Sequence, residues 1–279
     1  MKSPLIKKNN QLYCQLNNGE SMPLLGLGVY DMHGEEAVEA VRTAIETGYR
    51  LIDTVQMYEN EKQIGEGIRR VGMDRKEIFV TTKVNNTHQG YDQTLKAFEE
   101  SMQALDIEYI DMYLIHWPIK YKRKETWKAI EHLYKSGSVK GIGVANYLHP
   151  FLLELEDYAS IVPAINQMEF SPYLYMSDEI TYCNSHGICL QAYTPLVRGQ
   201  KFNDLRLGEL SVKYNKTPAQ IILRWAVQQG ISSIPKSSNP RRIKENFTIY
   251  DFEIEEKDIA AMNGWNENYR IVDDPMTMY

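Results

Sequence analysis

The chain alternates short apolar segments with amphipathic segments eight times, and this alternation limits the folds open to it more than any other feature. We expect the apolar segments to be strands of a parallel sheet, because such runs suit strands covered on both faces. Between them the apolar period becomes helical, as at Val38, Val41, Ala44 and Ile45. The predicted strands lie within residues 25–30, 49–54, 78–84, 109–116, 139–146, 164–171, 189–196 and 231–237.

Eight strand-helix units between residues 25 and 237 predict an α/β fold of the (β/α)8 barrel type. Because no linker rich in Pro, Gly or Ser divides the chain, we expect residues 1–279 to form one domain. Residues 11–25 carry Asn18-Gly19 between two apolar stretches, which predicts an N-terminal β-hairpin that plugs one end of the barrel.

The residues after Trp265 form no periodic pattern and include Tyr269 and Tyr279. We expect an irregular C-terminal tail that overhangs the active-site face.

Composition narrows the class of protein. Hydrophobic residues at 43% and charged residues at 24% are typical of a globular chain, and a net charge of −6 argues against a general nucleic-acid binder. Cys14, Cys183 and Cys189 are too few for a disulfide framework, so we expect free, buried thiols in a reducing compartment. With no signal-peptide pattern and no apolar run near the ~20 residues of a membrane span, a cytoplasmic protein is predicted.

Four residues are candidates for catalysis: Asp53, Tyr58, Lys83 and His116. Three of them end successive predicted strands, and Tyr58 follows Asp53 by five residues. Barrels of this type keep their catalytic groups at the C-terminal ends of the strands. A carboxylate, a phenol, an amine and an imidazole are therefore expected to converge on one face.

Together these groups suit the reduction of a carbonyl, which needs a hydride and a proton. No side chain donates hydride, so a nicotinamide cofactor is implied. Tyr58 would supply the proton, helped by the Lys83 ammonium, while Asp53 keeps Lys83 charged and His116 orients the substrate oxygen. Taken singly, the same residues are as well explained by a turn cap, a rim aromatic, a surface amine and a core histidine.

The residues around these positions resemble the aldo-keto reductase family over nearly the whole chain. That resemblance implies a barrel, NADPH, and Tyr58 as general acid supported by Asp53, Lys83 and His116. The matching segments are 51–54 with Tyr58 and Asn60-Glu61, Lys83-Val84, 114–118, 142–146, 166–170, 193–196, 234–237 and 242–246.

The resemblance also implies where the cofactor binds, because Gly141-Ile142-Gly143 lacks the third glycine of a Rossmann loop. Asn146 and Gln167 are similar to the residues that bind the nicotinamide carboxamide, and Tyr193 to the residue that stacks on the ring. A cluster after the eighth strand is similar to the site of the adenosine 2′-phosphate, which implies a preference for NADPH over NADH. The remaining implied cofactor residues are Thr194, Leu196, Lys236, Ser237, Arg242, Glu245 and Asn246.

The chain departs from the family pattern at a few positions, and these departures weaken the prediction of the substrate more than that of the reaction. Ala145 stands where Ser is usual, which removes one hydrogen bond of about 1 kcal/mol to the carboxamide. Asn85-Asn86 replaces Trp-Asn, and Ser171 replaces His. The expected substrate is a small aldehyde or ketone, bound by a monomer. The residues expected to wall its pocket are Tyr30, Asn85, His116 and Trp117.

Two other functions remain open at this level. A metal-dependent barrel hydrolase is disfavoured, since the six histidines include no closely spaced pair and only His116 ends a strand; we expect no metal. A non-catalytic barrel that holds NADPH as a regulatory or redox-sensing ligand is the second.

Overall fold

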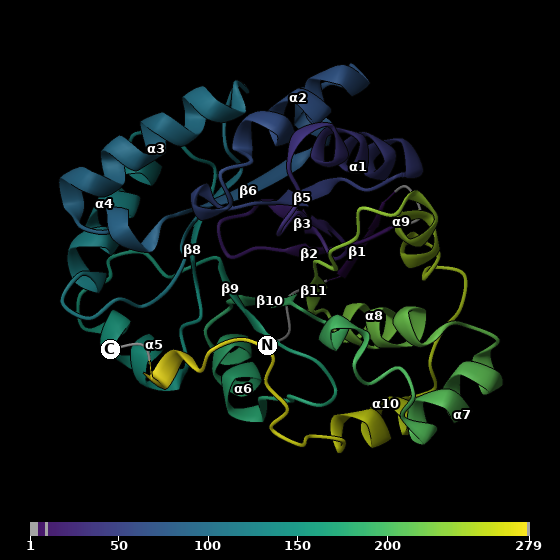
Figure 1. Ribbon diagram of the computed structural model, residues 1–279. Coiled ribbons are helices and arrows are strands. Elements are labelled where there is room, and N and C mark those ends of the chain that lie inside the picture. Colours follow the sequence, from purple (N-terminus) through teal and green to yellow (C-terminus); the bar gives the residue numbers. More distant parts are fainter. Residues whose placement is uncertain (1–4, 9–10, 278–279) are drawn as a thin grey trace.

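Eight parallel strands form a closed barrel in the computed structural model, which describes residues 5–8 and 11–277 (Figure 1). The strands pair in chain order, and parallel bridges from Leu25 to Ser233 and from Gly28 to Lys236 join the last strand to the first. The predicted barrel is confirmed. Its strands are β4 (Leu27–Gly28), β5 (Leu51–Asp53), β6 (Phe79–Val84), β7 (Met112–Ile115), β8 (Ile142–Ala145), β9 (Ile165–Glu169), β10 (Cys189–Tyr193) and β11 (Ser232–Ser233).

Helices surround the barrel, and their apolar faces pack on the strands (Figure 1). The residues of β5 to β9 are all buried, as expected for strands covered on both faces. The helices are α1 (Gly34–Thr47), α2 (Glu61–Val71), α3 (Tyr91–Leu105), α4 (Arg123–Lys135), α5 (His149–Glu156), α6 (Ser177–Ser185), α7 (Leu205–Tyr214), α8 (Pro218–Gln228), α9 (Pro240–Phe247) and α10 (Glu256–Asn263).

Two of these helices exceed the expected one per strand. Helix α7 precedes α8 between β10 and β11, and α10 follows α9. In α7 only Leu207 and Leu210 are buried, so its apolar face is too narrow to stand out in the sequence. By contrast, α8 begins as predicted, with a capping box between Thr217 and Gln220 and a proline in the first turn.

The N-terminal sheet closes one end of the barrel. The predicted hairpin is present as β2 (Gln11–Gln15) and β3 (Ser21–Pro23), but a further strand, β1 (Leu5–Lys8), pairs with β2. In the hairpin turn, the Asn17 amide donates to the carbonyl of Pro163 at 3.0 Å and the Asn18 amide to that of Lys140 at 2.9 Å. Both acceptors precede strands, so the turn lies at the N-terminal end of the barrel.

Short 3-10 helices lie in several of the connections. They are η1 (Gln56–Tyr58), η2 (Arg75–Glu77), η3 (Asn86–His88), η4 (Val197–Gly199) and η5 (Pro275–Thr277). Over the described residues, no helix has both the length and the apolar character needed to cross a bilayer. Tyr279 lies outside the described residues, whereas the tail up to Thr277 is irregular except for η5, as expected.

Candidate active site

A buried ion pair lies at the C-terminal ends of β5 and β6. The Lys83 ammonium donates to Asp53 Oδ1 at 2.7 Å and to the carbonyl of Thr54 at 2.8 Å. Lys83 is 1% exposed and Asp53 3% exposed. A lysine so completely buried needs a partner for its charge, and the neighbouring strand supplies one.

The ion pair continues as a chain of polar side chains across the barrel. Asp53 Oδ2 accepts a hydrogen bond from Gln167 Nε2 at 2.7 Å, and the same nitrogen lies 2.7 Å from Gln191 Oε1. Gln191 was not predicted as a site residue. The sequence feature that could have indicated Gln191 is its polar side chain within the apolar run of β10. It lies two positions before Tyr193 and therefore on the same face of the strand.

Burial dominates the titration of the ion pair. It raises the pKa of the Asp53 carboxyl more than Lys83 and Gln167 lower it. It lowers the pKa of the Lys83 ammonium despite the attraction of Asp53 and of the buried Glu61. Each charge therefore depends on its partner. The loss of either group would leave the other charge buried and unpaired, at the full cost of its desolvation.

Tyr58 ends η1, on the loop that follows β5. Its ring is half-buried and meets the ring of Tyr30 edge-on, with centroids 5.2 Å apart. Burial raises the pKa of the Tyr58 hydroxyl, and the negative charge of Asp53 raises it further. The help that the Lys83 ammonium is expected to give in releasing this proton stays a prediction.

His116 follows β7 and is buried as a neutral imidazole. Burial, together with the positive charge of Lys83, lowers the pKa of His116 to about 3. Its Nδ1 is buried and finds no hydrogen-bond partner among the described residues. The ring contacts Trp117 edge-on, at 6.1 Å between centroids, and Trp117 is itself buried.

We expect His116 to make the fold sensitive to acid. An unfolded histidine takes up a proton as the pH falls below about 6.5, whereas buried His116 stays neutral, so stability should fall from pH 6.5 toward pH 3. Between pH 6.5 and 5 the free energy of unfolding should fall by about 2 kcal/mol. Urea unfolding at both pH values should show a smaller loss for His116→Asn than for the parent. Equal losses in the two proteins would contradict the assignment.

The amide and phenol predicted to hold the nicotinamide lie together. Asn146 follows β8 with a left-handed φ of 64°, and its Nδ2 donates to the carbonyl of His116 at 2.9 Å. The Tyr193 hydroxyl donates to Asn146 Oδ1 at 2.7 Å. Thr194 follows with another left-handed φ, of 49°, and Leu196 precedes η4. These groups lie next to the hydrogen-bonded chain of Asp53, Lys83 and Gln167, because they end or follow the strands on either side of β9.

The residues predicted to bind a phosphate lie elsewhere on the rim, after β11 and on α9. Lys236 and Arg242 are exposed, and neither has a carboxylate within 4.0 Å in the part of the chain that the structure describes. Ser237 Oγ accepts from the backbone of Asn239, which caps α9 through the N–H groups of residues 241 and 242. Asn246 is buried and Glu245 half-buried on the same helix.

Of the predicted pocket walls, Tyr30 is half exposed beside Tyr58, and Trp117 packs on His116. Asn85 differs from these two, because its side chain accepts from the backbone N–H of Thr87 at 3.3 Å and so caps η3. The structure thus gives Asn85 a turn-stabilising contact beside its predicted role.

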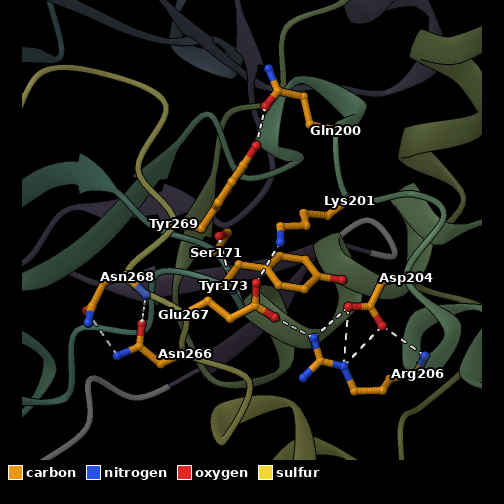
Figure 2. Close-up of polar contacts among 10 residues, drawn as sticks. All are labelled: Ser171, Tyr173, Gln200, Lys201, Asp204, Arg206, Asn266, Glu267, Asn268 and Tyr269. Carbon is orange, nitrogen blue, oxygen red and sulfur yellow. Dashed lines mark hydrogen bonds and ion pairs between the residues drawn. The ribbon is translucent and has the colours of Figure 1, made fainter.

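The tail lies against the loops that follow β9 and β10. Glu267 accepts from Lys201 at 2.6 Å and Arg206 at 2.7 Å, and the Tyr269 hydroxyl donates to Gln200 at 2.6 Å (Figure 2). Ser171 Oγ caps the turn at Tyr173, and the Tyr173 carbonyl accepts from the backbone N–H groups of Glu267 and Tyr269.

A second anchor for the tail is Glu169, which sequence reasoning did not single out. Its buried carboxylate accepts from the backbone N–H groups of Ile271 at 2.6 Å and Val272 at 3.1 Å. Glu169 ends β9 and points to the same face as Gln167, two residues earlier. The tail therefore passes over the C-terminal face, in agreement with its predicted course.

No group of three or more His, Cys, Asp or Glu side chains within residues 5–8 and 11–277 is arranged to hold a metal ion. Asp53, Lys83, Tyr58 and His116 end or follow strands of a closed parallel barrel, at the end where enzymes with this fold keep their catalytic groups.

Comparison with known proteins gives the family. The sequence model of the Aldo/keto reductase family matches residues 24–267, and the chain belongs to this family. It is 47% identical to "Uncharacterized oxidoreductase YtbE" of Bacillus subtilis (strain 168), over 95% of this chain and 96% of that protein. Identity to the "Glyoxal reductase" of the same organism is 45%, over 94% and 95% of the two chains.

A solved structure extends the comparison to the cofactor. A mutant of Gox0644 in complex with NADPH superposes with a TM-score of 0.91 at 38% identity, covering 96% of this chain and 98% of that one. A structural relative of this chain thus binds NADPH.

Proposed function

We propose that the protein reduces an aldehyde or ketone to the alcohol with NADPH, and that Tyr58 supplies the proton. The observation that carries this proposal is the buried chain Lys83, Asp53 and Gln167, with Tyr58 and His116 beside it. A carboxylate, an ammonium and an amide linked in a desolvated site at the C-terminal face of the barrel support a functional role.

The residues present fit a nicotinamide dinucleotide. Asn146 and Gln167 place amide groups at the ends of neighbouring strands, and Tyr193 adds a ring beside them. Lys236 and Arg242 are exposed cations near the N-terminus of α9, which suits a phosphate. When bound, the cofactor supplies the hydride.

The side chains would share the remaining work. Tyr58, whose pKa is raised, keeps its proton until negative charge develops on the substrate oxygen. Lys83 provides positive charge near that oxygen, held in place by Asp53. His116, whose low pKa keeps the imidazole neutral, is suited to a hydrogen bond that orients the carbonyl.

An assay of carbonyl reduction tests this proposal. The protein and NADPH are mixed with a panel of aldehydes, ketones and α-dicarbonyls, and the absorbance of the reduced nicotinamide is followed. Glyoxal belongs in the panel because a relative with 45% identity is named for its reduction. We expect NADPH to be oxidised as the alcohol forms. Tight NADPH binding without turnover of any carbonyl would overturn the reductase proposal and favour a regulatory barrel.

The preference for NADPH has its own test. In the variant Lys236→Ala/Arg242→Ala, loss of two charged contacts should raise the NADPH dissociation constant at least about tenfold, since charge-assisted hydrogen bonds contribute roughly 1.5–3 kcal/mol each. The NADH constant should change less than about threefold. Fluorescence titration measures both, with the exposed Lys257→Ala on α10 as control. Equal losses for the two cofactors would contradict a 2′-phosphate site here.

A further inference from the structure

The three cysteines of the chain are all buried, and two of them touch. Cys14 lies in β2 of the N-terminal sheet, and Cys189 is the first residue of β10. Their sulfur atoms are 2.9 Å apart, although 175 positions separate the residues in sequence. This contact joins the hairpin to the barrel at the end opposite the candidate active site.

Both backbones are held by regular pairing. Cys14 pairs with Leu5 on one side and Met22 on the other, so it sits in the central strand of its sheet. Cys189 pairs with Ile165, and its N–H donates to the carbonyl of Ala164 at 2.9 Å. Because two sheets fix the positions of the thiols, the contact does not depend on a mobile loop.

We propose that Cys14 and Cys189 are an oxidation site, at which a low-molecular-weight disulfide such as oxidised glutathione converts the two thiols into an intramolecular disulfide. One thiolate attacks the reagent and forms a mixed disulfide, releasing one reduced thiol. The second thiolate then displaces the other reagent sulfur. Two S–H bonds are lost and one S–S bond forms, and two electrons and two protons leave on two molecules of reduced reagent.

Burial makes this reaction slow in the folded protein. Cys14 is 0% exposed and Cys189 3% exposed, and the pKa of the Cys189 thiol is raised by its contact with Cys14 and by burial, so little reactive thiolate forms. The reagent gains access when the hairpin separates from the barrel. The bond is therefore expected to form during folding in an oxidising medium, and to be slow to form or break afterwards.

Cys183 provides a matched control. It lies on α6, is equally buried, and is close enough to Cys189 to influence its titration, but its thiol contacts Asn166. The pairing assigned by the geometry is therefore between Cys14 and Cys189, with Cys183 left as a thiol. A bond over this sequence distance removes chain entropy from the unfolded state and should stabilise the fold.

The experiment refolds the full chain from urea in glutathione buffers of graded redox ratio, then alkylates the free thiols under denaturing conditions and maps the peptides by mass spectrometry. In oxidising buffer we expect a linked Cys14–Cys189 peptide pair, two hydrogens lighter than the thiols, with Cys183 alkylated. The melting temperature should rise by about 4 °C or more. Cys183→Ser should behave identically, and Cys14→Ser should show neither the link nor the rise.

Two results would overturn the proposal: three alkylated cysteines in the parent at every ratio, or a bond that includes Cys183. Both are read on the unaltered chain, so poor folding of a variant leaves the test intact. Because the contact lies at the N-terminal end of the barrel, the oxidised and reduced proteins should bind NADPH within about twofold of each other.

Discussion

Replacement of Tyr58 by Phe is expected to lower kcat/KM for carbonyl reduction by about 10²–10⁴-fold and to leave the NADPH dissociation constant within about twofold. The substitution removes one hydroxyl and keeps the ring that packs on Tyr30. A proton donor stabilises the transition state, where charge develops on the oxygen, and contributes little to cofactor docking. Steady-state kinetics and fluorescence titration separate the two effects.

Tyr30→Phe is the matched control for this variant. Tyr30 carries the neighbouring phenol, 5.2 Å away between ring centroids, and is half exposed. Its loss should change kcat/KM less than about tenfold, as for a group outside proton transfer. If Tyr58→Phe kept most of its activity, the proton would have to come from another group and the proposed mechanism would fail.

Replacement of Lys83 by Met should lower the free energy of unfolding by about 3–5 kcal/mol, because it leaves Asp53 buried without its cation. The double variant Asp53→Asn/Lys83→Met should recover most of that stability, since neither charge is then present. Both the single and the double variant should lose activity. Urea unfolding measures the stability of each variant, and turnover assays measure its activity.

A second buried ion pair shows whether the loss of activity follows merely from the loss of stability. Arg75 and Asp111 lie 2.6 Å apart at the N-terminal end of the barrel, and both are buried, although the Lys140 ammonium also lies 3.6 Å from Asp111. Arg75→Met should lower the free energy of unfolding, yet the folded fraction should keep its kcat. If it lost activity as fully as Lys83→Met, the specific role of Lys83 would not stand.

The barrel could be predicted because its signal is local and repeated. Each buried strand must be apolar, and each helix must carry an apolar face, so the pattern appears eight times in the sequence. The features that went unpredicted have weak local signals: β1 is only Leu5–Lys8, with two lysines, and α7 buries only two leucines. Such elements form because the folded barrel offers them a surface.

In the candidate site, strand-end placement indicated that Asp53, Lys83 and His116 would share a face. The structure places Lys83 against Asp53 and adds two residues that spacing alone did not reveal: Gln191, which accepts from Gln167, and Glu169, which anchors the tail. Burial also raises the pKa of Tyr58, which the residue spacing did not indicate. Desolvation depends on everything packed around a group, and no short sequence pattern reports that.

The sequence by itself determined the barrel, the order of its strands and the residues at their C-terminal ends, because these follow from periodicity along the chain. Only the tertiary structure decided which of those residues touch, how deeply each is buried, and that Cys14 meets Cys189. The Lys83–Asp53 contact, 30 positions apart in sequence, depends on the pairing of β5 with β6, and the Cys14–Cys189 contact, 175 positions apart, on the packing of the N-terminal sheet against the barrel.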